Sequence, residues 1–260
     1  NDKVSYNIIQ KPTQALNILY PHKDFDLAFE EQRQERVTND VDIKELVGKE
    51  GLNRIMSYVE ETNPVPKRYD FIYKDVNNYE PIFSPDKIGK YSAKIKTICD
   101  HIVSSNGVIL VYSQYIDGGV LPLALALEQL GFTRKGGDGT TTRNLFDKGL
   151  LPKKKKNLKY AMITGDKAFS PNNAQEMKAI TSPENEDGSI VKVVLISRAG
   201  SEGLDFKFIR QVHVMEPWYN MNRIEQIIGR AVRTCSHKQL VFSKRNVEIY
   251  LHCLSLTNRV

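Results

Sequence analysis

Two clusters of side chains in the last third of the chain could act together on a phosphate-bearing ligand. Gln226, Arg230 and Arg233 have the i, i+4, i+7 spacing that places side chains on one face of a helix. Two guanidinium groups on one face suit phosphate oxygens, because arginine keeps its charge and can donate two parallel hydrogen bonds. For the arginine pair alone, a solvated basic helix face is an equally good interpretation.

A glycine-containing turn at 197–205 supplies the second cluster. Gly200 and Gly203 permit close approach of the backbone, their amide groups can face an anion, and Asp205 can accept hydrogen bonds from sugar hydroxyls. By itself this turn also fits a plain connection between a strand and a helix. The two clusters together favour a site for nucleotide phosphates.

The elements around these clusters follow the pattern of an α/β domain with a mostly parallel sheet. From Tyr91 onward, short apolar runs that are typical of buried parallel strands alternate with helical segments. The predicted strands are 108–112, 160–163, 191–196, 211–215 and 246–254, and the predicted helices are 92–105, 119–130, 172–180 and 222–233. Ligands of open parallel sheets bind beyond the carboxyl ends of the strands, which is where Ser113, Thr164 and Ser197 fall.

Two motifs give this pattern a family resemblance. Ser-Arg-Ala-Gly-Ser-Glu-Gly-Leu-Asp at 197–205 resembles motif V of superfamily 2 helicases, and Gln-Ile-Ile-Gly-Arg-Ala-Val-Arg at 226–233 matches the Q-x-x-G-R-x-x-R pattern of their motif VI. The segment 216–220, Glu-Pro-Trp-Tyr-Asn, resembles the equivalent joint in Swi/Snf-type translocases. The nearest likeness is to poxvirus-type early transcription factors and nucleoside triphosphatases of large DNA viruses, and it covers roughly 91–255.

The resemblance implies a C-terminal RecA-like domain, the second motor half of an ATP-dependent helicase or translocase. Arg230 and Arg233 would then be catalytic, as arginine fingers at the γ-phosphate. Gly203 and Asp205 would approach the nucleotide, and Gln226 would couple its state to domain closure. The nucleic-acid contacts that the resemblance implies are Ser113, Gln114, Thr164, Gly165, Ser197 and Arg198.

The sequence lacks the residues that would hold ATP and Mg²⁺ on their own. It contains no G-x-x-x-x-G-K-[ST] loop, and no Asp-Glu pair ends an apolar run; these elements bind phosphates and magnesium in P-loop enzymes. We therefore expect a missing N-terminal RecA-like domain to bind most of the ATP and Mg²⁺. On this interpretation the chain is an excised piece of a longer protein and is inactive alone.

Charge favours a polyanionic partner for the half that carries the motifs. Residues 1–89 contain 12 Lys and Arg against 16 Asp and Glu, whereas residues 90–260 contain 25 against 15. Charge that only keeps the protein soluble would look similar. The predicted partners are nucleic acid, with DNA favoured over RNA, the N-terminal RecA-like domain, and RNA polymerase or transcription factors. The alternative is a non-catalytic nucleic-acid-binding or scaffolding domain of a transcription complex.

Cysteine usage and hydropathy exclude several other classes of protein. The three cysteines are far apart and form no Cys-x-x-Cys pair, so neither a disulfide framework nor a metal site is predicted. No apolar run approaches the roughly 18 residues that a membrane span needs, and no membrane partner is expected. A reducing, intracellular location fits, and the viral resemblance adds the virion or a cytoplasmic virus factory.

Residues 1–89 are predicted to be an acidic extension of mixed helix and strand, preceding a domain at 90–260. Within the extension we expect an extended lead-in at 1–21, a helix or connector at 25–38, a helix at 42–62 capped by Asp42, and a half-buried strand at 68–73. The aromatic stripe of that strand fits core packing better than base stacking. Segment 136–159 is predicted to be an exposed insertion, whose lysines either contact phosphates or are solvated.

Overall fold

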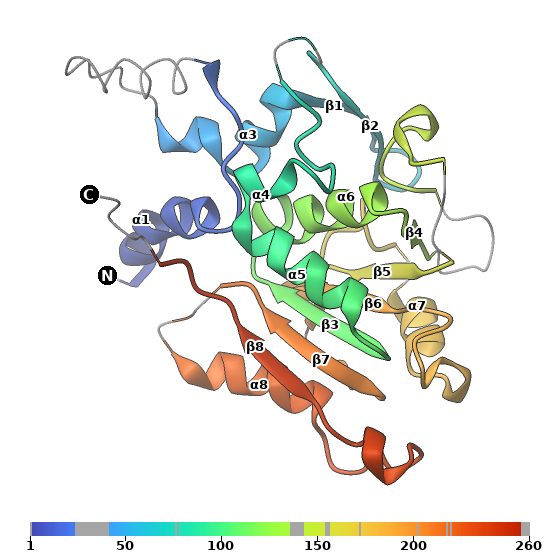
Figure 1. The fold of residues 1–260 in the computed structure, drawn as a ribbon. Coiled ribbons are helices and arrows are strands. Elements are labelled where there is room, and N and C mark those ends of the chain that lie inside the picture. Colours follow the sequence, from blue (N-terminus) through green and yellow to red (C-terminus); the bar gives the residue numbers. More distant parts are fainter. Residues whose placement is uncertain are drawn as a thin grey trace.

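The computed structural model describes residues 2–23, 42–75, 77, 79–135, 143–153, 157–171, 173–201, 203–216, 218 and 220–255, with side chains from Ile8 onward except that of Ser201. A six-stranded sheet with helices on both faces forms the larger part of the molecule (Figure 1). A separate two-stranded sheet lies beyond the helices of one face.

Every pairing between neighbours in the six-stranded sheet is parallel, and the strand order is β4-β5-β6-β3-β7-β8. The strands are β3 (Val108–Ser113), β4 (Thr133–Arg134), β5 (Lys159–Ile163), β6 (Val193–Ser197), β7 (Ile209–Val214) and β8 (Glu248–Leu251). Because side chains alternate along a strand, Ile109 and Val111 enter one hydrophobic cluster while Val108 and Leu110 enter another. The predicted α/β class with a mostly parallel sheet is confirmed.

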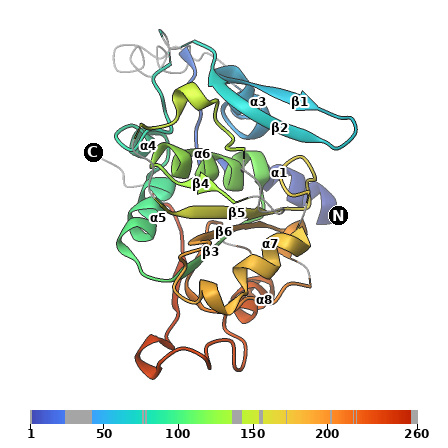
Figure 2. The ribbon, with the colours of Figure 1, turned by 90° about the vertical axis from the view of Figure 1, so that its right-hand side faces the viewer.

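Helices cover both faces of this sheet. α5 (Ala93–Ser104) and α6 (Leu121–Gln129) pack on one face, and α7 (Asn173–Ile180) and α8 (Met221–Ala231) pack on the other (Figure 2). Within the described part of the chain, no helix has the length and apolar character that crossing a membrane requires.

Helix α5 confirms its predicted cap and most of its predicted inward face. Ser92 Oγ accepts a hydrogen bond from the Ile95 N–H group at 2.9 Å, as an N-cap does. Ile95, Ile98 and Ile102 are fully buried. Val103, also predicted to point inward, is 49% exposed, because it falls one step outside the i, i+3, i+7 stripe.

Residues 1–21 are not the extended lead-in that their prolines suggested. α1 (Asp2–Ala15) is a helix that contains Pro12, and only the segment after it runs extended into the core, where Ile18 and Tyr20 are buried. A proline inside a helix removes one hydrogen bond. Here it lies close to the end of the helix, and packing of the following segment outweighs this local cost.

The predicted helix at 42–62 is instead two short helices followed by a strand. Asp42 caps as expected, since its carboxylate accepts from the Lys44 N–H group at 2.9 Å, but it opens a 3-10 turn, Ile43–Leu46. Gly48, with φ of +59°, then begins α3 (Gly48–Ile55). A positive φ suits glycine, so the glycine that weakened the predicted helix is the point at which the chain bends.

β1 (Met56–Glu61) and β2 (Lys67–Tyr73) form an antiparallel hairpin, which confirms the predicted strand at 68–73 and adds a partner that was missed. Pairing with β2 overrides the helical periodicity of Met56–Glu61, since strand formation depends on tertiary context. Phe71 is fully buried and stacks on Tyr58, with ring centroids 4.7 Å apart. The aromatic stripe therefore contributes to the core at Phe71.

Part of the predicted exposed insertion at 136–159 is buried, which corrects that prediction. Leu145 and Phe146 are fully buried, and their N–H groups donate to the two carboxylate oxygens of Glu128 at 2.7 and 2.9 Å. Burial raises the pKa of Glu128 to about 7. The β1–β2 hairpin also contacts this segment, because the Phe71 N–H group donates to the Leu145 carbonyl at 2.8 Å. Residues 136–142 and 154–156, like the element predicted at 25–38, lie outside the described residues.

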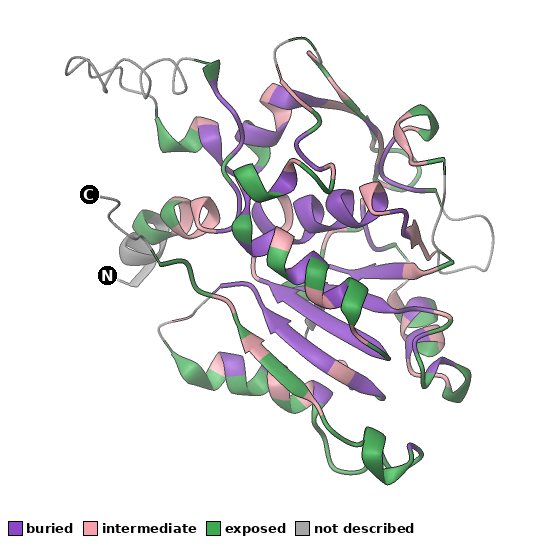
Figure 3. Cartoon of the chain, in the orientation of Figure 1, coloured by how far each residue is buried: buried purple, intermediate pink, exposed green. Residues whose placement is uncertain are grey.

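The first 89 residues share a hydrophobic cluster with the rest of the chain. Ile18, Leu52 and Phe83 belong to the same cluster as Ile109 and Leu123. α4 (Ile88–Tyr91) spans the predicted boundary. The colouring by burial shows this continuous interior between the small sheet and the large one (Figure 3). The division into 1–89 and 90–260 stays a prediction about independent folding.

We expect acid to destabilise the fold through two histidines where β8 packs on β7. His213 Nδ1 lies 2.9 Å from His252 Nε2, with His101, Tyr250 and Glu248 of the surrounding elements close by. Burial first, then neighbouring positive charge, lowers the pKa of His213 to about 3 and that of His252 to about 4.

A histidine in an unfolded chain has a pKa of about 6.5. Below that pH the unfolded chain therefore binds protons at these two residues that the folded chain does not bind. The contribution of these two histidines to the free energy of unfolding should fall as the pH drops from about 6.5 towards 4, whereas Glu128, whose pKa burial raises to about 7, contributes in the opposite direction. Urea midpoints of the wild-type chain and of His252→Gln at pH 7.5 and pH 5 test this, because the wild-type midpoint should fall relative to that of the variant at the lower pH. Equal pH dependence of the wild-type chain and this variant would contradict the assignment.

Candidate functional site

The carboxyl ends of three neighbouring strands bring together the hydroxyl residues predicted to contact nucleic acid. Ser113 and Ser197 are register partners at the ends of β3 and β6, and Thr164 directly follows β5, the other neighbour of β6. All three side chains are buried, and their hydroxyl groups form hydrogen bonds within the chain. Direct contact between these hydroxyls and a phosphate stays a prediction.

Ser197 holds the turn that follows β6 against the end of β5. Its Oγ accepts from the N–H groups of Gly165 and Gly200 at 3.4 and 3.3 Å. A side chain at Gly200 would have its Cβ 2.0 Å from the Ile163 carbonyl oxygen. Gly200 therefore allows two turns to pack, and its amide is already used, in contrast to the open anion-binding amide expected from the sequence.

Three other predicted nucleic-acid contacts lie closer to solvent at the same edge of the sheet. Gly165 and Arg198 are exposed, and Gln114 is half-buried. Lys167, which the sequence analysis did not single out, adds an exposed ammonium group two residues after Gly165. This edge can therefore offer cations and backbone to a polyanion.

Two members of the predicted Gln226, Arg230 and Arg233 cluster lie on α8. Ile224, Ile227 and Ala231 are buried, which leaves Gln226 exposed and Arg230 half-buried. This amphipathic pattern is the reason the segment folds as a surface helix. Asn220 caps it, with its side-chain oxygen accepting from the Asn222 N–H group at 2.9 Å.

Arg233 lies outside this helix, which corrects the prediction that it shares a helical face with Gln226 and Arg230. Val232 follows the last helical residue with φ −115° and ψ 43°, so the chain turns there. Arg233 Nη1 then donates to Asp205 Oδ2 at 2.7 Å, while Arg230 Nη1 donates to the Leu204 carbonyl at 3.4 Å. The two predicted clusters are therefore in contact, because the chain turns after α8 and brings Arg233 to Asp205.

The ion pair between Asp205 and Arg233 is open to solvent. Their side chains are 56% and 59% exposed, and an exposed pair stabilises a fold by at most about 1 kcal/mol. A ligand could therefore replace either partner at small cost. The backbone beneath is fixed, because the Phe206 N–H group donates to the Arg230 carbonyl at 3.1 Å. Gly203 has a φ of +71°, and among the described residues no atom lies within 4 Å of the place a Cβ would take there.

A family model described as the helicase conserved C-terminal domain matches residues 93–235, more than half of the chain. The chain belongs to this family. The match runs from α5 to the turn after α8 and includes every predicted site residue. The parallel sheet agrees with the RecA-like fold that the resemblance implied.

Relatives of this helicase C-terminal domain occur in large DNA viruses, as the sequence resemblance predicted. A candidate ATP-dependent RNA helicase of Acanthamoeba polyphaga mimivirus is 35% identical over 168 residues, which are 64% of this chain and 26% of the relative. A termination factor NPH-I homologue of African swine fever virus is 30% identical over 181 residues, covering 62% of this chain and 26% of the relative. The chain thus spans about a quarter of these relatives.

Among solved structures, the C-terminal part of the Fun30 ATPase domain is similar to 64% of this chain, with 15% identity and a TM-score of 0.42. The alignment covers 42% of that structure. A TM-score this low does not allow any functional role to be carried over.

The helicase C-terminal domain also contains functional candidates that sequence reasoning missed. Glu216 is buried beneath the site and accepts from the Gln114 N–H group at 2.9 Å. The guanidinium carbon of Arg223 lies 4.3 Å from the centroid of the Trp218 ring, and this contact ties the joint before α8 to its first turn. The likeness of 216–220 to a translocase joint was the signal in the sequence for Glu216 and Trp218, and Arg223 had none.

The residues around Asp205 fit one wall of a nucleotide site. They offer two guanidinium groups, one exposed carboxylate and a backbone turn with a positive φ. Among the described residues, no group of three or more His, Cys, Asp or Glu side chains could hold a metal ion.

Proposed function

We propose that this chain is the second motor domain of an ATP-dependent helicase or translocase. The observation that carries the proposal is the open pair of Asp205 and Arg233 beside Arg230, at the meeting of two helicase-like motifs. Charged groups that are positioned yet exposed are suited to a ligand brought by a facing domain. Membership of the helicase C-terminal family supports the same function.

In this proposal a first RecA-like domain holds most of the ATP and Mg²⁺, and this chain completes the site. Arg230 and Arg233 contact the γ-phosphate and stabilise the charge that develops in phosphoryl transfer. Asp205 and Gly203 approach the nucleotide, and Gln226 transmits its state to the movement of the two domains. The bound nucleotide supplies the transferable phosphoryl group.

The proposed nucleic-acid face is the carboxyl edge of β3, β5 and β6. Gln114, Gly165 and Arg198 contact the sugar-phosphate backbone there. Ser113, Thr164 and Ser197 contribute to the same contacts, and their hydroxyl groups also hold the turns in place. Contacts of this kind position a protein without reading base sequence. DNA is the substrate we favour, although the mimivirus relative is named as an RNA helicase.

A role in viral transcription is part of the same proposal. The African swine fever virus relative is named as a termination factor homologue, which supports RNA polymerase or transcription factors as partners. The virion or a cytoplasmic virus factory is the corresponding location.

Nucleic-acid binding is expected to be independent of sequence and to weaken as salt rises from about 50 to 200 mM, because phosphate contacts release counterions. Arg198→Ala should weaken binding to all sequences alike and make the logarithmic dependence on salt less steep by about 1. Fluorescence anisotropy with short duplexes of two unrelated sequences measures both quantities.

Lys96→Ala is the matched control for this experiment. Lys96 is half-buried on α5, where it forms an ion pair with Asp100 and lines a hollow with Phe83 and Leu130, none of which belongs to the proposed face. The control should keep the wild-type slope. Binding by the wild-type chain that ignores the change in salt would reject the proposed nucleic-acid face, and equal slopes for the two variants would reject the role of Arg198.

A further inference from the structure

A buried polar cluster joins three parts of the chain that are far apart in sequence. Asn17 follows α1, Lys94 lies in the first turn of α5, and Glu216 follows β7. The side chains are 1%, 4% and 3% exposed, respectively. Three polar side chains this deeply buried need a reason, because burying them costs free energy unless their hydrogen bonds are satisfied.

Asn17 lies between the two charged groups and contacts both. Its Oδ1 accepts from Lys94 Nζ at 2.9 Å, and its Nδ2 donates to Glu216 Oε1 and to the Gly118 carbonyl, the latter at 3.0 Å. These contacts determine which end of the amide faces which partner. An aspartate at this position would place a second carboxylate directly against Glu216.

Burial and the opposite charge act in opposite directions on the two ionisable members. Burial raises the pKa of Glu216 and lowers that of Lys94, and the attraction between the two groups works against both shifts. Lys94 Nζ has a second acceptor, the Met215 carbonyl at 2.7 Å. The ammonium group is therefore fixed to the backbone next to Glu216 as well as to Asn17.

Glu216 in turn holds the end of β3. Its Oε1 accepts from the Ser113 hydroxyl, and its Oε2 accepts from the Gln114 N–H group at 2.9 Å. Gly119 packs closely against this end of β3, since a Cβ there would lie 1.9 Å from Ser113 Oγ and 3.3 Å from Glu216 Oε1.

Two other residues of the extension, Tyr20 after α1 and Arg68 on β2, contact the turn that follows β3. The Tyr20 hydroxyl donates to the Asp117 carbonyl at 3.1 Å. The buried guanidinium of Arg68 on β2 lies 3.0 Å from the Asp117 carboxylate. The loop after β3 is thus held by residues of the extension as well as by Glu216, five positions before α8.

We propose that Asn17 and Lys94 are positioning residues that, through Glu216, couple the nucleic-acid contacts at the end of β3 to the arginine-bearing helix α8. The inference rests on the proposed function, in which those two places bind nucleic acid and nucleotide. It assigns to the extension a part in communication between the two sites.

The test uses the complete motor chain with its first RecA-like domain, and short duplex DNA as the probe. ATP hydrolysis is measured with and without saturating DNA, together with the KM for ATP and the melting temperature. For Asn17→Asp, the stimulation by DNA should fall by roughly 5- to 150-fold, the usual range of coupling between sites. Hydrolysis without DNA and the KM for ATP should change little, because neither site is touched.

The double variant Asn17→Asp with Glu216→Gln separates coupling from simple stability. It exchanges the amide and the carboxylate, so one negative charge still lies beside one amide, and Lys94 keeps an acceptor. We expect it to regain much of the DNA stimulation lost in Asn17→Asp, and to fold even if the single variant does not.

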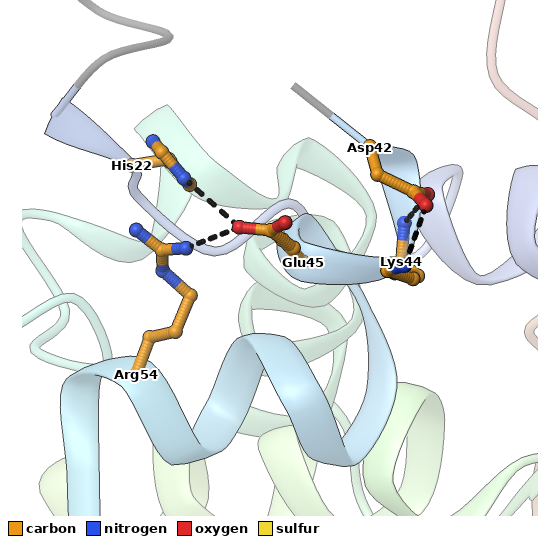
Figure 4. Close-up of polar contacts among 5 residues, drawn as sticks. All are labelled: His22, Asp42, Lys44, Glu45 and Arg54. Atoms are coloured by element: carbon orange, nitrogen blue, oxygen red, sulfur yellow. Dashed lines mark hydrogen bonds and ion pairs between the residues drawn. The ribbon is translucent and has the colours of Figure 1, made fainter. Parts of the chain in front are cut away.

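Glu45→Gln is the matched control within the same extension. Glu45 bonds to His22 Nε2 at 3.3 Å and to Arg54 Nη1 at 2.7 Å on the surface of the extension (Figure 4). Its replacement disturbs the extension without reaching β3. The stimulation by DNA should match that of the wild type.

Three outcomes overturn the inference. The first is a folded Asn17→Asp variant that DNA stimulates as strongly as the wild type. The second is a double variant that folds but shows no more stimulation by DNA than Asn17→Asp. The third is a Glu45→Gln variant that loses as much stimulation as Asn17→Asp. Failure of the wild-type motor to respond to DNA at all would instead reject the proposed function, and the inference with it.

Discussion

Replacing Arg233 by alanine is expected to slow ATP hydrolysis by roughly 10³-fold or more in a motor chain that also contains the first RecA-like domain. An arginine finger stabilises charge on the transferred phosphoryl group, and alanine supplies neither its charge nor its two parallel donors. Affinity for ATP should fall much less, because in the proposed motor the phosphate loop of the first domain holds the ground state. Steady-state hydrolysis with saturating nucleic acid measures the effect.

Two further variants show whether the rate depends on charge, on geometry or on the ion pair. Arg233→Lys should remain strongly impaired, because it keeps the charge but loses the fork of donors. Asp205→Ala removes the partner of Arg233 in an exposed pair worth at most about 1 kcal/mol, so its melting temperature should stay close to that of the wild type. Near-wild-type hydrolysis by Arg233→Ala would show that this arginine belongs to a solvated basic surface.

The parallel sheet could be predicted because its signals are local. β3, β5, β6 and β7 are short apolar runs, and Ser92 and Asn220 are polar caps that lie next to the helices they start. The motif turn at 197–205 and the arginines of 226–233 were likewise visible as spacing. The structure adds that a turn at Val232, rather than a helix face, brings Arg233 to Asp205.

Several of the features that were missed depend on partners elsewhere in the sequence. Met56–Glu61 has the spacing of a helix, and only its pairing with β2 makes it a strand. Leu145 is buried because Glu128 and Phe71 take up its backbone groups. Asn17 gave no signal, because its acceptor Glu216 lies 199 positions away. Periodicity and motif spacing cannot report such contacts.

Replacing Phe71 by alanine is expected to lower the free energy of unfolding of the chain by about 3–5 kcal/mol, the usual cost of removing a buried aromatic ring. Phe71 is fully buried in the cluster that the extension shares with α5 and α6. Its stacking on Tyr58 would also be lost. Urea denaturation followed by tryptophan fluorescence measures the change, since the chain has one tryptophan.

That single tryptophan makes the experiment a test of the division at residue 89. Trp218 packs against the other cluster, on the opposite face of the sheet. If residues 1–89 and 90–260 unfold as one cooperative unit, Phe71→Ala shifts the fluorescence transition as far as the circular dichroism transition. If the extension unfolds on its own, dichroism shows an early step and the Trp218 transition stays where it was. Ile72→Ala, on the same strand but 44% exposed, should change the stability by no more than about 0.5 kcal/mol. We expect the single cooperative transition, because Ile18, Phe71 and Phe83 pack in the same cluster as Ile109.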